Sequence, residues 1–285
     1  FSAAAAQLDC TQSRISHAVG GLEQELGVRL LLRSHDGSAP TDAGHRVLEQ
    51  ARQMLRIEAS LLDTARDSGT LAGHVRIACF RSVGTHLLPH ALEALAHEYP
   101  GIRIDIDDSC EERDDVTRAV REGRADIGIA HLPASGDLVA RPYLNDAYVL
   151  VAPASLKLDA PVAWRQLDAL PFIALACSGA AAILARCRAA GFSAEPSRMM
   201  SNDTSIAALV GRGLGYSILP RLATFPAPDD VRIIDLPLPA RREFALVGTP
   251  ETMRSQAVQV VTRFLRDRRI LAKTKAFKAG IIYFD

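Results

Sequence analysis

The chain has 285 residues, of which 48% are hydrophobic and 23% are charged, and its formal net charge is +0. This composition is typical of a globular protein of about two domains, and it excludes a membrane-spanning protein because no apolar run could cross a bilayer. The five cysteines are odd in number and widely spaced, which argues against a disulfide framework and favours reduced thiols. The chain also starts without a basic and then apolar leader, so we expect a cytoplasmic protein with no membrane partner. The neutral charge gives no support to nucleic-acid binding, which usually needs a basic surface.

The beginning of the chain predicts two short helices joined by a tight turn. Ser2 is a good N-cap for an alanine-rich first helix, and Thr11 is an N-cap for the second. Helices joined so closely cross at a steep angle, as in a helix-turn-helix. The apolar positions expected to pack the two helices together are Ala5, Leu8, Ile15, Val19 and Leu22.

Polar side chains at the start of the second helix predict a DNA-binding surface. Gln and Arg can read base edges in the major groove, whereas Ser, Thr and His can hold phosphates. The candidate residues are Thr11, Gln12, Ser13, Arg14, Ser16 and His17. The alternative is a small helical hairpin that packs on another part of the protein.

A β-hairpin is predicted directly after the second helix, because Asp36-Gly37 lies between two extended runs. Such a hairpin would be the wing of a winged helix, with Arg33 and His35 near a phosphate or the minor groove. The alternative interpretation of Asp36-Gly37 is a surface turn, and the two interpretations are compatible.

One long helix is predicted from Thr41 to about Asp67, followed by a hinge at residues 68–73. Apolar residues recur every seven positions along it, which is the seam that two helices need in order to pack side by side. The dimerisation candidates are Val47, Leu48, Ala51, Met54, Leu55, Leu61 and Leu62. The helix could instead pack on its own domain, but its length favours a dimer. The two DNA-binding domains of such a dimer suit a pseudo-palindromic DNA site.

From His74 the pattern changes to alternating strands and helices, which predicts α/β sheets. Strands are expected at residues 75–79, 102–106, 125–130, 148–151, 172–175 and 244–247. Helices are expected at residues 85–98, 114–122, 180–190, 205–210 and 255–268.

These residues resemble, in order and spacing, the LysR-type transcriptional regulators. In the first part the resemblance is carried by Ala5-Ala6, Leu8, Thr11-Gln12, Ile15-Ser16, Val19, Leu22-Glu23, Leu26-Gly27, Leu30-Leu31, Arg33 and Thr41-Asp42-Ala43-Gly44. In the second part it is carried by Leu87-Leu88-Pro89, Tyr99-Pro100, Glu122-Gly123-Arg124, Asp126-Ile127, Gly213-Leu214-Gly215 and Leu219-Pro220. The sequence departs from the family at Ser13-Arg14, where proline-alanine is usual, and at Leu31, which replaces a common phenylalanine. It also opens where the family's first helix should already have ended, so we expect that helix to be missing.

The resemblance implies four segments and an unassigned tail. They are an α winged helix-turn-helix domain at 1–44, a linker and dimerisation helix at 45–67, a hinge at 68–73, and an α/β two-lobed effector-binding domain at 74–268, similar to type II periplasmic binding proteins. Lobe I would comprise about 74–135 and 250–268, and lobe II about 140–249, with the chain crossing near 133–143 and near 248–252. Residues 269–285 have no counterpart in this scheme. The implied partners are double-stranded promoter DNA, a small-molecule effector that is expected to be anionic, and further copies in a homodimer or homotetramer. RNA polymerase is a further candidate partner, and no cofactor is expected.

The effector site is predicted in loops at the carboxyl ends of strands, because free amides of the following helices attract anions there. The loop expected at 81–85 offers hydroxyls, a glycine and a cation that would suit a carboxylate. The candidate residues are Arg81, Ser82, Gly84, Thr85, Arg113, His131, Pro133, Ser178, Asn202 and Thr204. The alternative for Ser82, Thr85 and Thr204 is a role as helix N-caps alone.

Other chemistry has weaker support in the sequence. His86, His90 and His97 have a spacing that can bind zinc, but such residues more often form a solvated helix face, so no metal site is predicted. Peroxide-sensing members of the LysR family use a cysteine pair in this region. Cys187 lies near the second cysteine of that pair, whereas Cys177 does not align with the first, so a redox-sensing regulator that uses Cys187 is one alternative. A solute-binding module without a DNA role is another. No nucleophile, base and orienting acid occur at a recognisable spacing, so we predict that the protein is not an enzyme.

Overall fold

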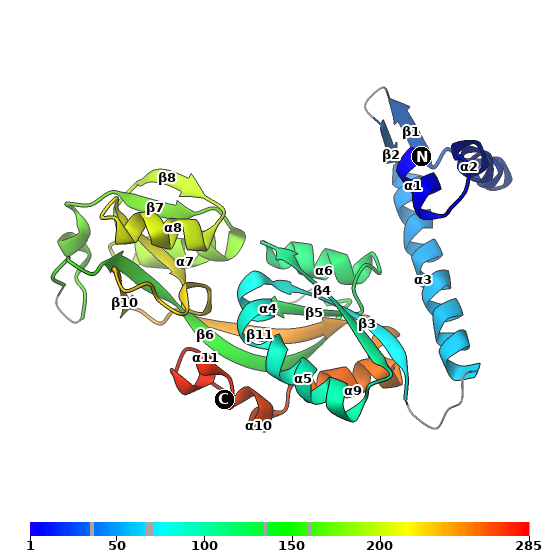
Figure 1. Cartoon of the computed structure of the whole chain (residues 1–285). Helices are drawn as coiled ribbons and strands as arrows, with labels where there is room; N and C mark the ends of the chain where they lie inside the picture. Colours follow the sequence, from blue (N-terminus) through cyan, green and yellow to red (C-terminus); the bar gives the residue numbers. More distant parts are fainter. Residues whose placement is uncertain (35–36, 66–70, 134–135, 159–160, 285) are drawn as a thin grey trace. The chain divides into compact units, whose positions relative to one another are not determined.

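The computed structural model describes residues 1–34, 37–65, 71–133, 136–158 and 161–284, which form two compact units at 1–66 and 67–285 (Figure 1). Each unit is described by itself. No helix in the described ranges is both long enough and apolar enough to span a bilayer.

The first unit is a winged helix-turn-helix followed by a long helix. Its elements are α1 (Ser2–Gln7), α2 (Gln12–Leu26), β1 (Leu31–Ser34), β2 (Gly37–Pro40) and α3 (Asp42–Ala65). The two strands pair in antiparallel register, with Leu31 opposite Pro40 and Ser34 opposite Gly37, so the predicted hairpin is confirmed.

The caps of the first two helices differ from each other. Thr11 is the N-cap of α2, as predicted, and its hydroxyl accepts from the Arg14 amide at 3.3 Å. The predicted cap at Ser2 is wrong, because Phe1 occupies the N-cap position of α1 and Ser2 already lies inside the helix. There the Ser2 hydroxyl lies 3.3 Å from Oε1 of Gln12.

The packing predicted between α1 and α2 is only partly present. Ala5 is buried, and Ile15 and Val19 are half-buried. Leu8 and Leu22, in contrast, are 67% and 41% exposed, and no residue of α2 is fully buried. The part of the chain that the structure describes therefore leaves an apolar surface open on this unit.

Glycine is required where the start of α3 passes Leu30, the residue directly before the first wing strand. A Cβ on Gly44 would lie 2.0 Å from the carbonyl oxygen of Leu30. Thr41 begins this turn, since its hydroxyl accepts from the Gly44 amide at 2.9 Å and donates to the Arg29 carbonyl at 2.8 Å. The Thr41-Asp42-Ala43-Gly44 sequence thus fixes how α3 leaves the wing.

The predicted seam of α3 is open to solvent in the single chain. Met54 and Leu55 are 71% and 63% exposed, Leu48 is also exposed, and Val47 and Ala51 are half-buried. The side chains of Leu61 and Leu62 lie outside the described part of the structure.

The second unit is a mixed α/β domain with two lobes. Its strands are β3 (Gly73–Phe80), β4 (Ile102–Cys110), β5 (Ile127–His131), β6 (Val139–Pro153), β7 (Phe172–Leu175), β8 (Pro196–Met200), β9 (Tyr216–Pro220), β10 (Val231–Asp235) and β11 (Arg241–Gly248). Its helices are α4 (Arg81–His86), α5 (Leu88–Glu98), α6 (Arg113–Arg121), α7 (Ser178–Ala189), α8 (Asp203–Gly211), α9 (Gln256–Leu265), α10 (Arg268–Leu271) and α11 (Lys275–Lys278), with short 3₁₀ turns η1 (Trp164–Leu167), η2 (Leu222–Thr224) and η3 (Thr252–Arg254). The predicted hinge ends early, because Gly73 already pairs with Ile102 at the start of β3.

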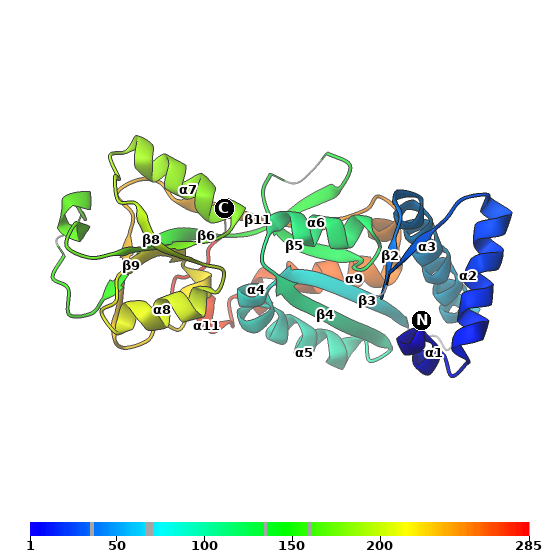
Figure 2. The same ribbon diagram turned by 90° about the horizontal axis from the view of Figure 1, so that it is seen from above.

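The described strands of this second unit lie in the order β4-β3-β5-β11-β6-β9-β7-β8, with β10 paired to β6. Figure 2 shows β3, β4 and β5 towards one end of β6 and β11, and β8 and β9 towards the other. Lobe I has two hydrophobic cores: α5 and α9 contribute to one of them, and α6 contributes to the other. In lobe II, α7 and α8 belong to two further cores. The 15-residue strand β6 runs through both lobes and joins them.

The lobes divide at positions other than those predicted. Leu144 and Phe244 belong to the core of lobe I, whereas Tyr148 and Ala240 belong to that of lobe II. The chain therefore crosses at 145–147 and 241–243, instead of near 133–143 and 248–252. The reason is that the crossings are not loops but the paired strands β6 and β11, with Arg242 opposite Asp146.

The unassigned tail packs on lobe I. Leu271, Ala276 and Ile282 are buried in its core. Tyr283 pairs with Asn145 as an isolated antiparallel bridge, with backbone hydrogen bonds of 2.9 and 3.0 Å. Residues 269–284 thus complete lobe I and reach the crossing between the lobes.

Candidate functional site

The outward face of α2 is the candidate DNA interface of the first unit. Gln12, Ser13, Arg14 and His17 are exposed, and Ser16 is half-buried. Thr11 is exposed too, but its hydroxyl is used by the cap of α2. On the wing, the side chain of Arg33 and all of His35 lie outside the described residues.

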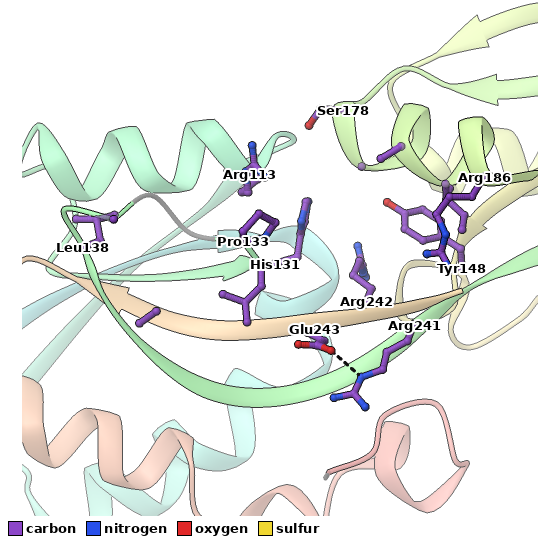
Figure 3. Close-up of a pocket in the computed structure, with 16 residues that line it drawn as sticks. Arg113, His131, Pro133, Leu138, Tyr148, Ser178, Arg186, Arg241, Arg242 and Glu243 are labelled. Atoms are coloured by element: carbon purple, nitrogen blue, oxygen red, sulfur yellow. Dashed lines mark ion pairs between the residues drawn. The ribbon is translucent and has the colours of Figure 1, made fainter. Parts of the chain in front are cut away.

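A cavity of about 890 Å³ lies between the lobes of the second unit (Figure 3). Lobe I supplies Arg113, His131 and Pro133, and α7 of lobe II supplies Ser178 and Arg186. The remaining lining residues are Leu132, Gly136, Leu138, Ala140, Tyr148, Gly179, Ala182, Ile183, Arg241, Arg242 and Glu243. A smaller cavity of about 70 Å³ adjoins it, and His131, Tyr148, Gly179 and Arg242 line both.

Seven of the ten predicted effector residues line these cavities. Arg113, His131, Pro133 and Ser178 line the larger one, and Arg81, Ser82 and Asn202 line the smaller one together with His131. Gly84, Thr85 and Thr204 line neither.

The misplacement of Gly84 and Thr85 has a local cause. The predicted loop at 81–85 is in fact helix α4, which begins at Arg81 and turns these residues away from the cleft. A Cβ on Gly84 would lie 3.0 Å from Cβ of Asp108 in β4, and Thr85 is exposed.

The alternative that the hydroxyl residues are only N-caps is also wrong. Phe80 is the N-cap of α4, and Asn202 is the N-cap of α8, accepting from the Ser205 amide at 2.8 Å. Thr204 is exposed, and its amide donates to Asp203 at 2.8 Å.

Arg242, which lines both cavities, belongs to a buried ion pair that was not predicted from the sequence. The Arg242 side chain is 8% exposed and its partner Asp146 is 0% exposed. Two hydrogen bonds of 2.7 Å join the guanidinium to the carboxylate, which also accepts from the Leu222 amide at 3.2 Å. Burial disfavours the charge on Arg242, but the Asp146 carboxylate outweighs it and holds the pKa of Arg242 above its ordinary value. The two residues are 96 positions apart in the sequence, so no local motif predicts their contact. The one available signal was that each is a charged residue inside a strand.

His131 is the titratable group at the centre of the site. Burial, and after it the nearby Arg242, lower the pKa of His131 to about 4. Its ring stacks on Phe80, with centroids 5.6 Å apart. At neutral pH His131 is therefore an uncharged hydrogen-bonding group.

Guanidinium groups from both lobes face the larger cavity. Figure 3 shows Arg113, Arg186 and Arg242 around the cavity. Arg241 and Glu243 also line it, but their side chains lie on the other face of β11, where they pair with each other at 3.2 Å. This alternation follows from the two-residue period of a strand. Arg242 is paired with Asp146, Arg113 pairs with Asp114 at 3.0 Å, and Arg186 donates to the carbonyl of Pro239. Guanidinium N–H groups of this kind are the donors that suit a carboxylate or a phosphate.

Of the cysteines and histidines singled out in the sequence, Cys177 lines the smaller cavity, whereas Cys187, His86, His90 and His97 line neither. Cys187 is buried, and burial raises its pKa, which disfavours the thiolate that a redox sensor needs. Burial also raises the pKa of Cys177, whose sulfur caps α7. His86 packs edge-on against Phe225, with centroids 5.4 Å apart.

A winged helix-turn-helix combined with a two-lobed α/β unit around a cleft defines a regulator with one DNA-binding unit and one ligand-binding unit. Family comparison agrees with this class. Residues 1–45 match the bacterial regulatory helix-turn-helix of the lysR family, and residues 68–269 match the LysR substrate binding domain. The chain therefore belongs to the LysR family of DNA-binding transcriptional regulators, as the sequence resemblance predicts.

Individual relatives support this membership. The chain is 38% identical over 245 residues to a probable HTH-type transcriptional regulator, LrrA, of Synechococcus elongatus, covering 85% of this chain and 83% of that protein. It is 30% identical over 231 residues to a probable hydrogen peroxide-inducible genes activator of Mycobacterium leprae, covering 78% and 73%.

Solved structures agree in fold. A full-length OxyR variant of Pseudomonas aeruginosa has a TM-score of 0.68 at 21% identity, covering 95% of this chain and 91% of that one. HinK, a LysR family regulator of the same species, has a TM-score of 0.60 at 23% identity, covering 93% and 91%.

Proposed function

We propose that this LysR-family regulator binds promoter DNA through the start of α2 and responds to a small anionic effector held between its two lobes. The observation that carries the effector half is the cavity between the lobes, with Arg113, Arg186 and Arg242 facing it. A ligand shifts the regulator between states only if it binds one state better than the other. A cavity that both lobes line meets this condition, because opening the cleft separates the two sets of contacts.

The class of effector follows from the guanidinium groups. Arginine binds carboxylates and phosphates through two parallel hydrogen bonds, and such charge-assisted bonds are about twice as strong as neutral ones. Arg242 is held by Asp146 in a buried pair, whereas Arg113 pairs with Asp114, which is 73% exposed, and Arg186 donates to the Pro239 carbonyl in an exposed contact. Exposed contacts are weaker, so Arg113 and Arg186 are the guanidinium groups we assign to the ligand. Each comes from a different lobe, so an effector that reaches both would join the two lobes.

The assembly that we propose is a homodimer through the open seam of α3, with a homotetramer as its extension. Exposed Leu48, Met54 and Leu55 support this, because a solvent-facing apolar stripe on a long helix is stabilised by a second helix.

The place where we propose that the regulator acts is the cytoplasm, because promoter DNA is found there. RNA polymerase, which is found there too, is our candidate further partner.

Replacing Arg14 by alanine should weaken binding to the cognate promoter by about 5- to 100-fold. This is the usual effect of removing one side chain that reads a base. The measurement is fluorescence anisotropy on DNA from upstream of the regulator's own gene and on scrambled DNA, at two salt concentrations. Arg198→Ala, an exposed arginine in β8, is the control and should leave both affinities unchanged. An equal loss on both DNAs would make Arg14 a phosphate contact, and no preference of the unaltered protein for the upstream DNA would contradict the DNA half of the proposal.

Replacing Arg186 by alanine should weaken binding of a small carboxylate by about 10-fold or more, because a charge-assisted hydrogen bond is lost. Titration calorimetry with acetate, succinate and citrate measures this. Arg188→Ala is the matched control on the same helix, since its guanidinium contacts Glu195 at 3.1 Å and lines neither cavity. If both variants bind these anions as the unaltered protein does, Arg186 has no part in the effector site.

A further inference from the structure

A carboxylate of lobe I binds directly to lobe II across the cleft. Glu112 precedes α6, and its two carboxylate oxygens accept from the backbone amide of Ser178 at 2.9 and 3.0 Å. The Ser178 hydroxyl donates to the same carboxylate. Ser178 is the first residue of the 12-residue helix α7, so Glu112 lies at a helix N-terminus that belongs to the other lobe.

The position of Glu112 is fixed within lobe I by a capping box. Glu112 is the N-cap of α6, its side chain accepts from the Asp115 amide, and its own amide donates to Asp115 at 3.0 Å. One carboxylate therefore satisfies free amides of two helices, one from each lobe. Charge-assisted bonds of this kind at helix N-termini are among the stronger hydrogen bonds in proteins.

The contact lies at the boundary of the two cavities. Glu112 lines the smaller cavity, while its partner Ser178 and its neighbour Arg113 line the larger one. A carboxylate ligand in the larger cavity would meet the amide and hydroxyl of Ser178 already bound to Glu112. The chain thus presents its own carboxylate at a position that suits an anionic ligand.

We infer that Glu112 is an internal competitor of the effector, which keeps the lobes together in the free regulator and must leave Ser178 when an anionic ligand binds there. This inference rests on the proposed function for the identity of the competing ligand. The bridge itself does not, and it can be tested without any ligand.

The first test is hydrogen–deuterium exchange of the full chain without ligand. In Glu112→Ala the amide of Ser178 loses its acceptor, so peptides covering 177–180 should exchange at least 10-fold faster. Asp115→Ala is the matched control, because it breaks the same capping box but leaves the carboxylate of Glu112 in place. Unchanged exchange in Glu112→Ala, or an equal increase in both variants, would overturn the bridge.

The second test is titration with citrate. Glu112→Gln removes the competing charge and should bind citrate at least about 5-fold more tightly than the unaltered protein, within the usual range of coupling between linked equilibria. Ser178→Ala should bind it more weakly. Equal affinity of Glu112→Gln and the unaltered protein would overturn the competition. If acetate, succinate and citrate all fail to bind to every variant, the anionic effector and its competition with Glu112 are both contradicted, and the exchange experiment alone decides the bridge.

Discussion

Replacing Arg242 by methionine is expected to lower the free energy of unfolding of the two-lobed unit by about 3–5 kcal/mol, the usual effect of breaking a buried ion pair. The reason is the carboxylate left behind. Asp146 is 0% exposed, and its remaining partner here is the Leu222 amide at 3.2 Å. Methionine fills a similar volume, so loss of packing contributes little.

Urea unfolding followed by the fluorescence of Trp164, the single tryptophan, measures this effect. Arg241→Met is the matched control, since the neighbouring side chain is exposed and pairs with Glu243 on the surface, a contact worth at most about 1 kcal/mol. The double variant Arg242→Met with Asp146→Leu should recover most of the loss, because no buried charge then remains. If Arg242→Met and Arg241→Met lower the free energy of unfolding equally, the buried ion pair matters no more to stability than the surface pair does.

Acid should destabilise the two-lobed unit through His131, by up to about 3 kcal/mol between neutral pH and pH 4. The pKa of His131 is lowered from 6.5 to about 4 in the folded protein, first by burial and then by Arg242. The unfolded chain therefore binds a proton at a higher pH than the folded one does. The stability that neutral His131 contributes is fully present above pH 6.5 and is lost as the pH falls from 6.5 towards 4.

The measurement is the free energy of unfolding at pH 7.5, 6 and 5 for the unaltered protein and for His131→Gln. The variant should show a flatter dependence on pH, because glutamine cannot take up the proton. His97→Gln, an exposed histidine in α5, should keep the slope of the unaltered protein. If His131→Gln keeps that slope as well, His131 does not titrate as its surroundings indicate.

Local signals in the sequence were enough for most of the elements. Thr11 as a cap, Asp36-Gly37 between extended runs and the seven-residue spacing in α3 each depend on residues close together in the chain. They predict the helix-turn-helix, the wing and the long helix correctly. The family resemblance extends this to the two-lobed domain.

The errors and omissions arise from contacts that are distant in sequence. The start of α4 at Arg81 and the crossing in β6 and β11 depend on tertiary packing, which no turn residue marks. Arg242 and Asp146 are 96 positions apart, and Glu112 and Ser178 are 66 apart. Each of these residues is an ordinary surface type in the sequence, and only the fold brings the partners together.

The pairing of β6 with β11 limits how the lobes can move. Both crossings belong to one antiparallel ribbon, in register from Arg241 opposite Ala147 to Gly248 opposite Val139, with one irregularity between Glu243 and Ala245. A hydrogen-bonded ribbon of two strands keeps its length, but its twist varies widely. We therefore expect a ligand in the cleft to turn one lobe against the other by changing the twist of this ribbon, which parts the two walls of the cleft without lengthening the strands.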